Sequence, residues 1–167
     1  MQKVRKEFYD MATNFIDMTK KHAVCESSKL LATKGGAHIY NIKISQDLDN
    51  GSIVAKNEYK EPEVYDMKAV NEGFAGKVIG KAGNGNWLIE VTDAQDAILL
   101  LNVPMIYEEY TTAMQAEHNF YNKNGDIVRG YELVNGDVFA ISPEGITGSV
   151  DVKKAVKVTG HKLAINE

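Results

Sequence analysis

The chain has 167 residues, of which 44% are hydrophobic and 25% are charged, and it carries a formal net charge of −4. This size and composition are typical of one globular domain that buries its own apolar core, and they exclude a wholly disordered chain. The negative balance disfavours nucleic acids, acidic substrates and anionic membrane surfaces as partners, because like charges repel.

The first segment carries an apolar stripe at helical spacing. Five apolar residues are separated by four, three, four and three positions: Val4, Phe8, Met11, Phe15 and Met18. This spacing places them on one face and predicts an amphipathic helix over about residues 2–22. Two interpretations stay open: the helix packs on its own domain, or it is an arm whose apolar face binds a partner. The segment is short for an autonomous coiled coil, which favours docking over self-association.

The residues after this segment separate two kinds of pattern. Residues 26–36 end in a Gly-Gly pair, which is typical of a break between elements. From residue 37 onward the apolar period changes to two, as in strands. We therefore divide the chain into an N-terminal helical arm with its connector, residues 1–36, and a β domain, residues 37–167.

Short runs of β-branched and aromatic residues predict the strands of the β domain. They lie at residues 38–44, 52–55, 74–79, 87–91, 97–103, 127–133, 138–141, 150–158 and 162–165. Asn-Gly pairs at 50–51, 124–125 and 135–136 predict tight turns, because this pair readily adopts positive φ angles. Residues 56–69 are predicted to form an irregular crossing, and residues 106–118 fit either a helix or extended chain. The pattern predicts a mainly β fold, a small barrel or sandwich with an N-terminal amphipathic helix, and an α+β fold is the alternative.

The sequence contains no recognisable catalytic or metal-binding motif. Asp47, Asp49 and Glu58 have the spacing of ligands in a calcium-binding loop, but Ser52 stands where that loop needs glycine. Cys25 is the only cysteine, which excludes an intramolecular disulfide and fits synthesis in a reducing compartment. No apolar run is long enough to span a bilayer. We expect a protein that is not an enzyme and that binds no metal or cofactor.

Aromatic side chains are the best candidates for a second contact surface. They concentrate in the second half of the chain beside Asn and Thr, and the candidate contact residues are Trp87, Tyr107, Tyr110 and Tyr121. Such a mixture fits stacking on sugar rings or an assembly interface, and it also fits a core in which the tyrosine hydroxyls are hydrogen-bonded.

Two stretches of the sequence resemble small β-rich head proteins of tailed bacteriophages, which decorate or cement the capsid. The first is 38–42 followed by 47–51, and the second is 119–133 with 136–142, so that the resemblance covers about residues 37–145. It implies a protein without catalytic residues that is made in the host cytoplasm. On the virion it would bind the exterior of the major capsid protein lattice, alone or as a homo-oligomer, and stabilise it.

A second function fits the same sequence. A carbohydrate- or cell-surface-binding β module would use Trp87 or the tyrosines as a stacking platform. The two functions differ in their readout, because a capsid protein co-purifies with particles whereas a sugar-binding module shows saturable glycan binding.

Overall fold

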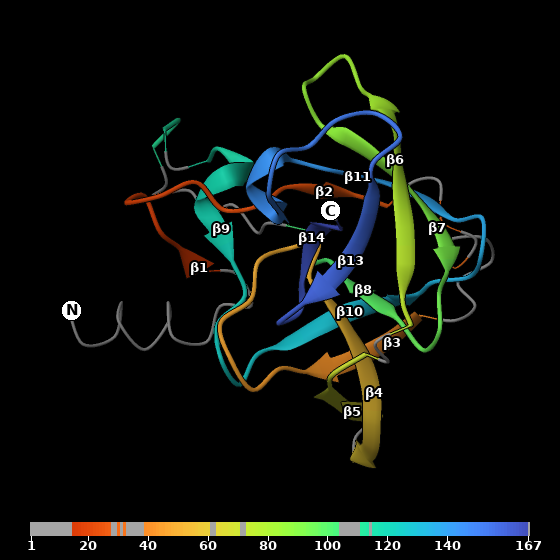
Figure 1. The fold of residues 1–167 in the computed structure, drawn as a ribbon. Coiled ribbons are helices and arrows are strands. Elements are labelled where there is room, and N and C mark those ends of the chain that lie inside the picture. The colour runs from red at the N-terminus through yellow and green to blue at the C-terminus, as the bar shows by residue number, and fades with distance from the viewer. Residues whose placement is uncertain are drawn as a thin grey trace.

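The computed structural model describes residues 15–27, 30, 32, 39–60, 63–70, 73–103, 111–113 and 115–166. These residues form a mainly β structure with a closed five-stranded barrel, a seven-stranded sheet and a separate two-stranded pair (Figure 1). The predicted mainly β fold class is confirmed, and the barrel was one of its two predicted architectures. The helical residues in this part of the chain lie in short 3-10 turns, among them η2 (Glu117–Asn119) and η3 (Pro143–Gly145).

The barrel has the strand order β10-β3-β5-β4-β8. Its strands are β3 (Ile39–Lys43), β4 (Ile53–Lys60), β5 (Val64–Lys68), β8 (Ile98–Leu100) and β10 (Ile127–Glu132). Every neighbouring pair is antiparallel except β3 and β5, which run parallel. The β4–β5 hairpin projects from the body of the molecule (Figure 1).

The larger sheet has the order β12-β14-β13-β6-β7-β11-β2. Its strands are β2 (Cys25–Glu26), β6 (Ala75–Lys81), β7 (Trp87–Asp93), β11 (Val138–Ile141), β12 (Ile146–Thr147), β13 (Ala155–Thr159) and β14 (Lys162–Asn166). The two-stranded pair joins β1 (Phe15–Ile16) to β9 (Phe120–Tyr121).

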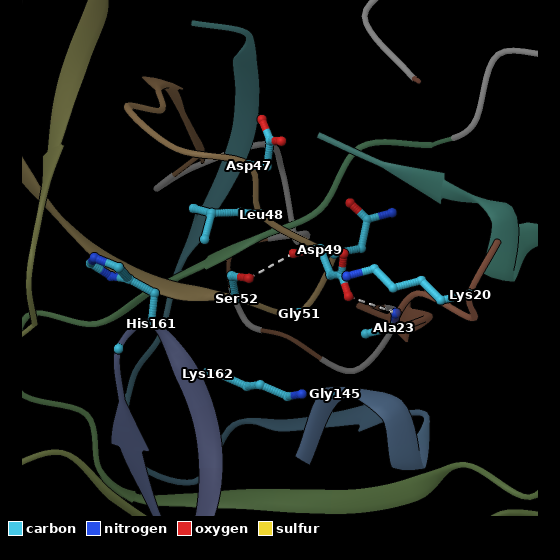
Figure 2. A pocket seen from close by; sticks show the side chains of 12 residues that line it. Lys20, Ala23, Asp47, Leu48, Asp49, Gly51, Ser52, Gly145, His161 and Lys162 are labelled. Atoms are coloured by element: carbon cyan, nitrogen blue, oxygen red, sulfur yellow. Dashed lines mark hydrogen bonds between the residues drawn. The ribbon is translucent and has the colours of Figure 1, made fainter. Parts of the chain in front are cut away.

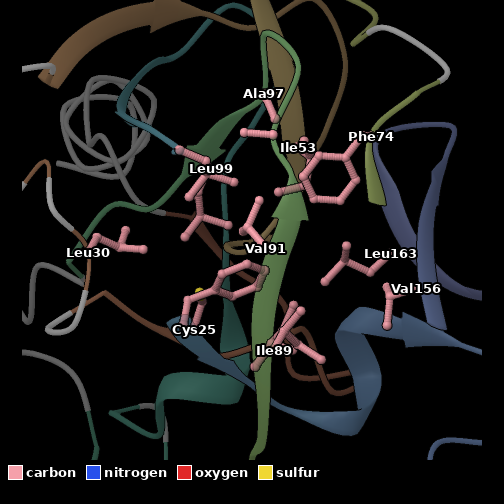
Figure 3. Packing of buried hydrophobic residues seen from close by; sticks show 14 of the residues in the cluster. Cys25, Leu30, Ile53, Phe74, Ile89, Val91, Ala97, Leu99, Val156 and Leu163 are labelled. Atoms are coloured by element: carbon pink, nitrogen blue, oxygen red, sulfur yellow. The ribbon is translucent and has the colours of Figure 1, made fainter. Parts of the chain in front are cut away.

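Two apolar cores lie on either side of a shared wall of barrel strands. Because successive side chains of a strand point to opposite faces, Ile53 and Leu99 enter the larger core, while Val54 and Ile98 point into the barrel. Figure 3 shows Ile53 and Leu99 beside Phe74 and Val91 in the larger core. The barrel and the larger sheet are therefore packed back to back.

The barrel interior is tightly filled. A Cβ atom added at Gly130 of β10 would lie 2.6 Å from Cγ2 of Ile98 and 3.0 Å from Cγ1 of Ile42. Only glycine allows the neighbouring strands to bring these side chains so close together.

The local turn predictions are confirmed. Gly51, Gly125 and Gly136 all have positive φ, between 88° and 94°.

A further turn between β13 and β14 places His161 at φ 67°. The backbone N–H of Ile53 donates to the His161 carbonyl oxygen at 2.9 Å, and ring atom Nδ1 of His161 lies 3.1 Å from the Ile53 carbonyl oxygen. This turn therefore fastens the larger sheet to the barrel.

The predicted N-terminal helix is wrong over residues 15–22, and residues 1–14 lie outside the described part of the chain. Residues 15–16 form β1, and the N–H groups of Asp17 and His22 donate to the carbonyl oxygens of Asn119 and His118 at 2.8 and 2.7 Å. Pairing with a distant segment has overridden the local helical period, because short helices gain little stability on their own. β2 pairs with β11, and Cys25, Leu30 and Ala32 lie in the larger core.

The predicted irregular crossing at residues 56–69 is also wrong, because most of it forms β4 and β5. These strands are polar along their exposed part, which hides the strand period in the sequence. In the ambiguous segment 106–118, residues 117–118 belong to η2, and residues 106–110 and 114 are not described.

Candidate functional site

The N-terminal segment is fastened to the β domain by a buried histidine. His22 is 4% exposed, and its Nδ1 and Nε2 lie 2.5 and 3.0 Å from carboxylate oxygens of Asp49 and Asp17. Tyr121 stacks on the ring at a centroid distance of 5.0 Å and an interplanar angle of 17°. Each ring nitrogen of His22 therefore has a carboxylate oxygen within hydrogen-bonding distance.

The two carboxylates are themselves held by backbone groups. The N–H of Thr19 donates to Asp17 Oδ1 at 2.9 Å, and the N–H of Ala23 donates to Asp49 Oδ2 at 3.1 Å. Hydrogen bonds from the Thr19 hydroxyl, from its backbone N–H and from His22 lower the pKa of Asp17 to about 2. These hydrogen bonds hold residues 17–23 against the loop that contains Asp49.

A pocket of about 230 Å³ lies beside this histidine, between the loop that precedes β4 and the β13–β14 turn (Figure 2). Its charged and polar lining includes Lys20, Asp47, Asp49, Ser52, His161 and Lys162. The Ser52 hydroxyl donates to the Asp49 carbonyl oxygen at 2.7 Å, and Asp47 accepts from the Asn124 N–H at 2.8 Å. The first bond closes the loop before β4, and the second ties that loop to residue 124. The pocket lies where four segments meet: the N-terminal segment, the loop before β4, η3 and the β13–β14 turn.

A second site lies on the β4–β5 hairpin and the adjacent strand β3. We call Tyr40, Tyr59 and Tyr65 the tyrosine cluster. Tyr65 meets Tyr40 and Tyr59 edge-on, with ring centroids 5.6 and 5.3 Å away and interplanar angles of 85° and 71°. Such edge-to-face pairs are favourable because the positive ring edge meets the negative ring face.

A β-bulge brings these side chains together. Lys56 pairs with Met67 and Tyr59 pairs with Tyr65, with a register shift between the two pairs. In a regular strand Lys56 and Tyr59, three residues apart, would face opposite sides. The extra residue of the bulge turns Tyr59 to the side on which Lys56 already lies.

Lys56 fixes the orientation of the tyrosine rings. Its Nζ lies 3.9 Å from the ring centroid of Tyr40 and 5.0 Å from that of Tyr65, within cation–π range. The Tyr40 hydroxyl donates to Glu132 Oε2 at 3.2 Å. Tyr40 is thereby held at both its ring face and its hydroxyl, and Tyr65 is held at its ring face.

The tyrosine cluster borders a depression of about 310 Å³. Its lining adds Ile39, Asn41 and Glu63 to the three tyrosines. Glu63 has a φ of 54°, a conformation that residues with side chains seldom adopt.

The structure scatters the residues that the sequence predicted as contact sites. Val4, Phe8, Met11, Tyr107 and Tyr110 lie outside the described residues. Phe15 begins β1, and Met18 is 55% exposed just after it.

The two remaining aromatic candidates belong to separate sheets. Trp87 begins β7 of the larger sheet and lies half-buried, with Lys81 Nζ 5.2 Å from its ring centroid. Tyr121 is in β9 and packs on His22. Trp87 and Tyr121 therefore do not form one surface. Trp87 contacts Lys81, and Tyr121 contacts His22.

Sequence reasoning missed the tyrosine cluster. Tyr59 and Tyr65 fall in the segment that was predicted to be irregular, and the parallel pairing of β3 with β5 brings Tyr40 beside them. The available signal was the concentration of three tyrosines between residues 40 and 65. Their meeting depended on a bulge and a parallel register that no local pattern indicates.

The remaining chemistry of the described residues is limited. Burial raises the pKa of the Cys25 thiol to about 12, so this cysteine is a protonated core residue. The described residues include no group of three or more His, Cys, Asp or Glu side chains that is able to hold a metal ion. In the same part of the chain, no helix has the length and apolar character needed to cross a membrane.

Comparison with protein-family models, with curated proteins and with solved structures finds no match to this chain.

Proposed function

We propose that this protein is a structural virion protein that binds the exterior of an assembled bacteriophage capsid and stabilises it, acting by binding and not by catalysis. The proposal is supported by the resemblance of residues 37–145 to small phage head proteins. It is consistent with a β structure in which Ser52 and Asp47, two polar side chains of the pocket lining, are engaged in hydrogen bonds that hold loops.

The observation that carries the proposal is the fastening of the N-terminal segment. β1 and β2 pair with β9 and β11, and His22 binds Asp17 and Asp49 between them. Met18, the last residue of the apolar stripe, is exposed within this fastened stretch. An exposed methionine at a fixed position is well suited to an apolar contact with another protein.

The affinity of a single contact between this chain and the capsid does not need to be high. A capsid lattice repeats the same binding site many times, so an oligomer of this chain would bind several sites at once. The stabilising effect on the shell follows because a ligand that binds only the assembled state lowers the free energy of that state.

The proposal is tested with the double substitution Phe8→Asp/Met18→Asp. We expect the variant to lose sedimentation with capsids, because it replaces two apolar side chains of the N-terminal segment with charges that would have to be buried at the interface. The Met18 part of the change should leave the β domain folded, because that side chain is 55% exposed. Sedimentation with purified particles and circular dichroism measure the two properties.

Val103→Asp is the control for a new surface charge, because it places one aspartate on a residue that is 77% exposed elsewhere on the molecule. The control should bind particles like the unchanged protein. If the double variant still decorates particles, or if both variants lose binding equally, the N-terminal segment is not the contact.

A further inference from the structure

The tyrosine cluster is a surface that the capsid contact proposed above does not use. Tyr59 is 53% exposed, although aromatic rings of this kind usually gain stability from burial. Its orientation depends on the bulge in β4 and on the ring of Tyr65. The hairpin thus presents an aromatic face to solvent in a fixed position.

The neighbouring depression supplies polar groups beside this aromatic face. Asn41 and Glu63 line it together with the tyrosines. Its volume of about 310 Å³ is at the lower end of the range of about 300–1,000 Å³ for small-molecule sites. A protein partner would instead need a broad interface of about 800 Å² on each side.

Glu63, at the turn position just before β5, combines a place in the lining with a left-handed backbone conformation. Its φ of 54° is unfavourable for a residue with a Cβ, and glycine would fit there without strain. Strained positions of this kind are frequent at ligand sites, where a particular side chain is needed in spite of its cost in folding free energy.

The chemistry of the lining selects the ligand class. A pyranose ring offers an apolar face of C–H groups, which packs on the negative face of an aromatic ring. Its hydroxyls are donors and acceptors for a carboxylate such as Glu63 and an amide such as Asn41. Glu63 is the charged residue of the lining, and the Lys56 ammonium is engaged with the rings of Tyr40 and Tyr65. The carboxylate of Glu63 and the net charge of −4 therefore disfavour phosphates, sugar carboxylates and nucleic acids as ligands.

We propose that the tyrosine cluster, with Asn41 and Glu63, is a binding site for an uncharged pyranose unit of a glycan. Tyr59 supplies the stacking face, and Glu63 and Asn41 bind the hydroxyls. Lys56 holds Tyr40 and Tyr65 in place, so little ordering is needed when the sugar binds. This site does not rest on the capsid proposal, because it acts in the isolated chain.

The test is a titration of the full chain with maltotriose, cellotriose and triacetylchitotriose, three uncharged trisaccharides, followed by NMR. We expect saturable binding of at least one trisaccharide, with a dissociation constant on the order of 1 mM or lower. Tyr59→Ala should weaken it roughly tenfold, the effect typical of losing one stacking face. Tyr59→Phe keeps that face and should bind within about threefold of the unchanged protein.

Glu63→Gly separates binding from stability. The variant should melt at a higher temperature, because glycine relieves the backbone strain, and it should bind the trisaccharide more weakly. A residue with only a structural role would not raise the melting temperature and lower the affinity together.

Three results would overturn the proposal. The first is no saturable binding of any trisaccharide at about 10 mM. The second is unchanged binding in Tyr59→Ala. The third is loss of capsid sedimentation in Tyr59→Ala without any sugar binding, which would make the cluster a protein contact. Failure of the capsid proposal alone would leave the sugar titration unaffected.

Discussion

The larger core and the barrel core of this protein differ in size and in how far the surrounding side chains are buried. The larger core collects side chains from both sheets and from the N-terminal segment, including Cys25 and Leu30. The barrel core is small, and the half-buried rings of Tyr40 on β3 and Tyr65 on β5 pack against it. The comparison indicates that the larger core supplies most of the stability, while the barrel leaves aromatic side chains accessible for binding.

The largest effect is expected in the larger core. Phe139 of β11 is fully buried there. Phe139→Ala should lower the free energy of unfolding by about 3–5 kcal/mol, because a large apolar side chain is lost and a cavity remains. Urea denaturation measures this change. Tyr59→Ala on the hairpin serves as the contrast and should stay within about 0.5 kcal/mol of the unchanged protein; a similar loss in both variants would contradict the comparison.

The next effect concerns the closure of the larger core by the N-terminal segment. His22→Ala removes two hydrogen bonds to carboxylates and the stacking on Tyr121. We expect a loss of about 1–3 kcal/mol and faster hydrogen exchange at Val24, whose N–H donates to the Ser142 hydroxyl. The exposed neighbour Met18, replaced by Ala, should change stability by less than about 0.5 kcal/mol. Equal exchange rates in the two variants would show that His22 does not hold the segment.

The smallest effect is a pH dependence on the barrel side. Burial raises the pKa of Asp126 to about 6, and its Oδ2 is buried without a hydrogen-bond partner among the described residues. Between its ordinary pKa near 3.8 and about 6, the folded chain binds more protons at this group than the unfolded chain. Its contribution to stability is therefore lost as the pH rises through this range.

Asp126→Asn should remove this contribution, which is roughly 1 kcal/mol because the carboxyl group is only partly buried. The amide keeps an acceptor for the N–H of Ile127, which donates to Asp126 Oδ1 at 3.1 Å. Thermal unfolding at pH 4 and pH 7 in both proteins measures the difference. An unchanged pH slope in the variant would assign the dependence to another group.

Asp17 acts in the opposite sense at lower pH. Its lowered pKa, about 2, means that the charge favours the folded state above the ordinary pKa of 3.8. That contribution is lost as the pH falls through about 2.

The sequence predicted those parts of the fold that depend on neighbouring residues. The Asn-Gly turns at Gly51 and Gly136 and the strand β11 were found because turn chemistry and β-branched runs act locally. The path of residues 15–26 was not found, because β1 and β2 pair with strands about a hundred residues away. A helical period in that segment carried no information about those partners.

The candidate sites show the same contrast between features that local sequence determines and features that depend on distant segments. Trp87 and Tyr121 were identifiable as aromatic residues, but their contacts with Lys81 and His22 depend on tertiary packing. The tyrosine cluster required the bulge in β4 and the parallel register of β3 with β5. Neither feature follows from residue type, since a shift of one residue turns a side chain to the other face.

The central proposal, that this chain is a component of the capsid exterior, is tested most directly by a density gradient of a phage lysate in which the chain is produced. Mass spectrometry of the fractions locates the chain relative to the shell protein. We predict that it bands with intact particles at a fixed ratio to that protein. Recovery of the chain only as free protein at the top of the gradient would contradict the proposal.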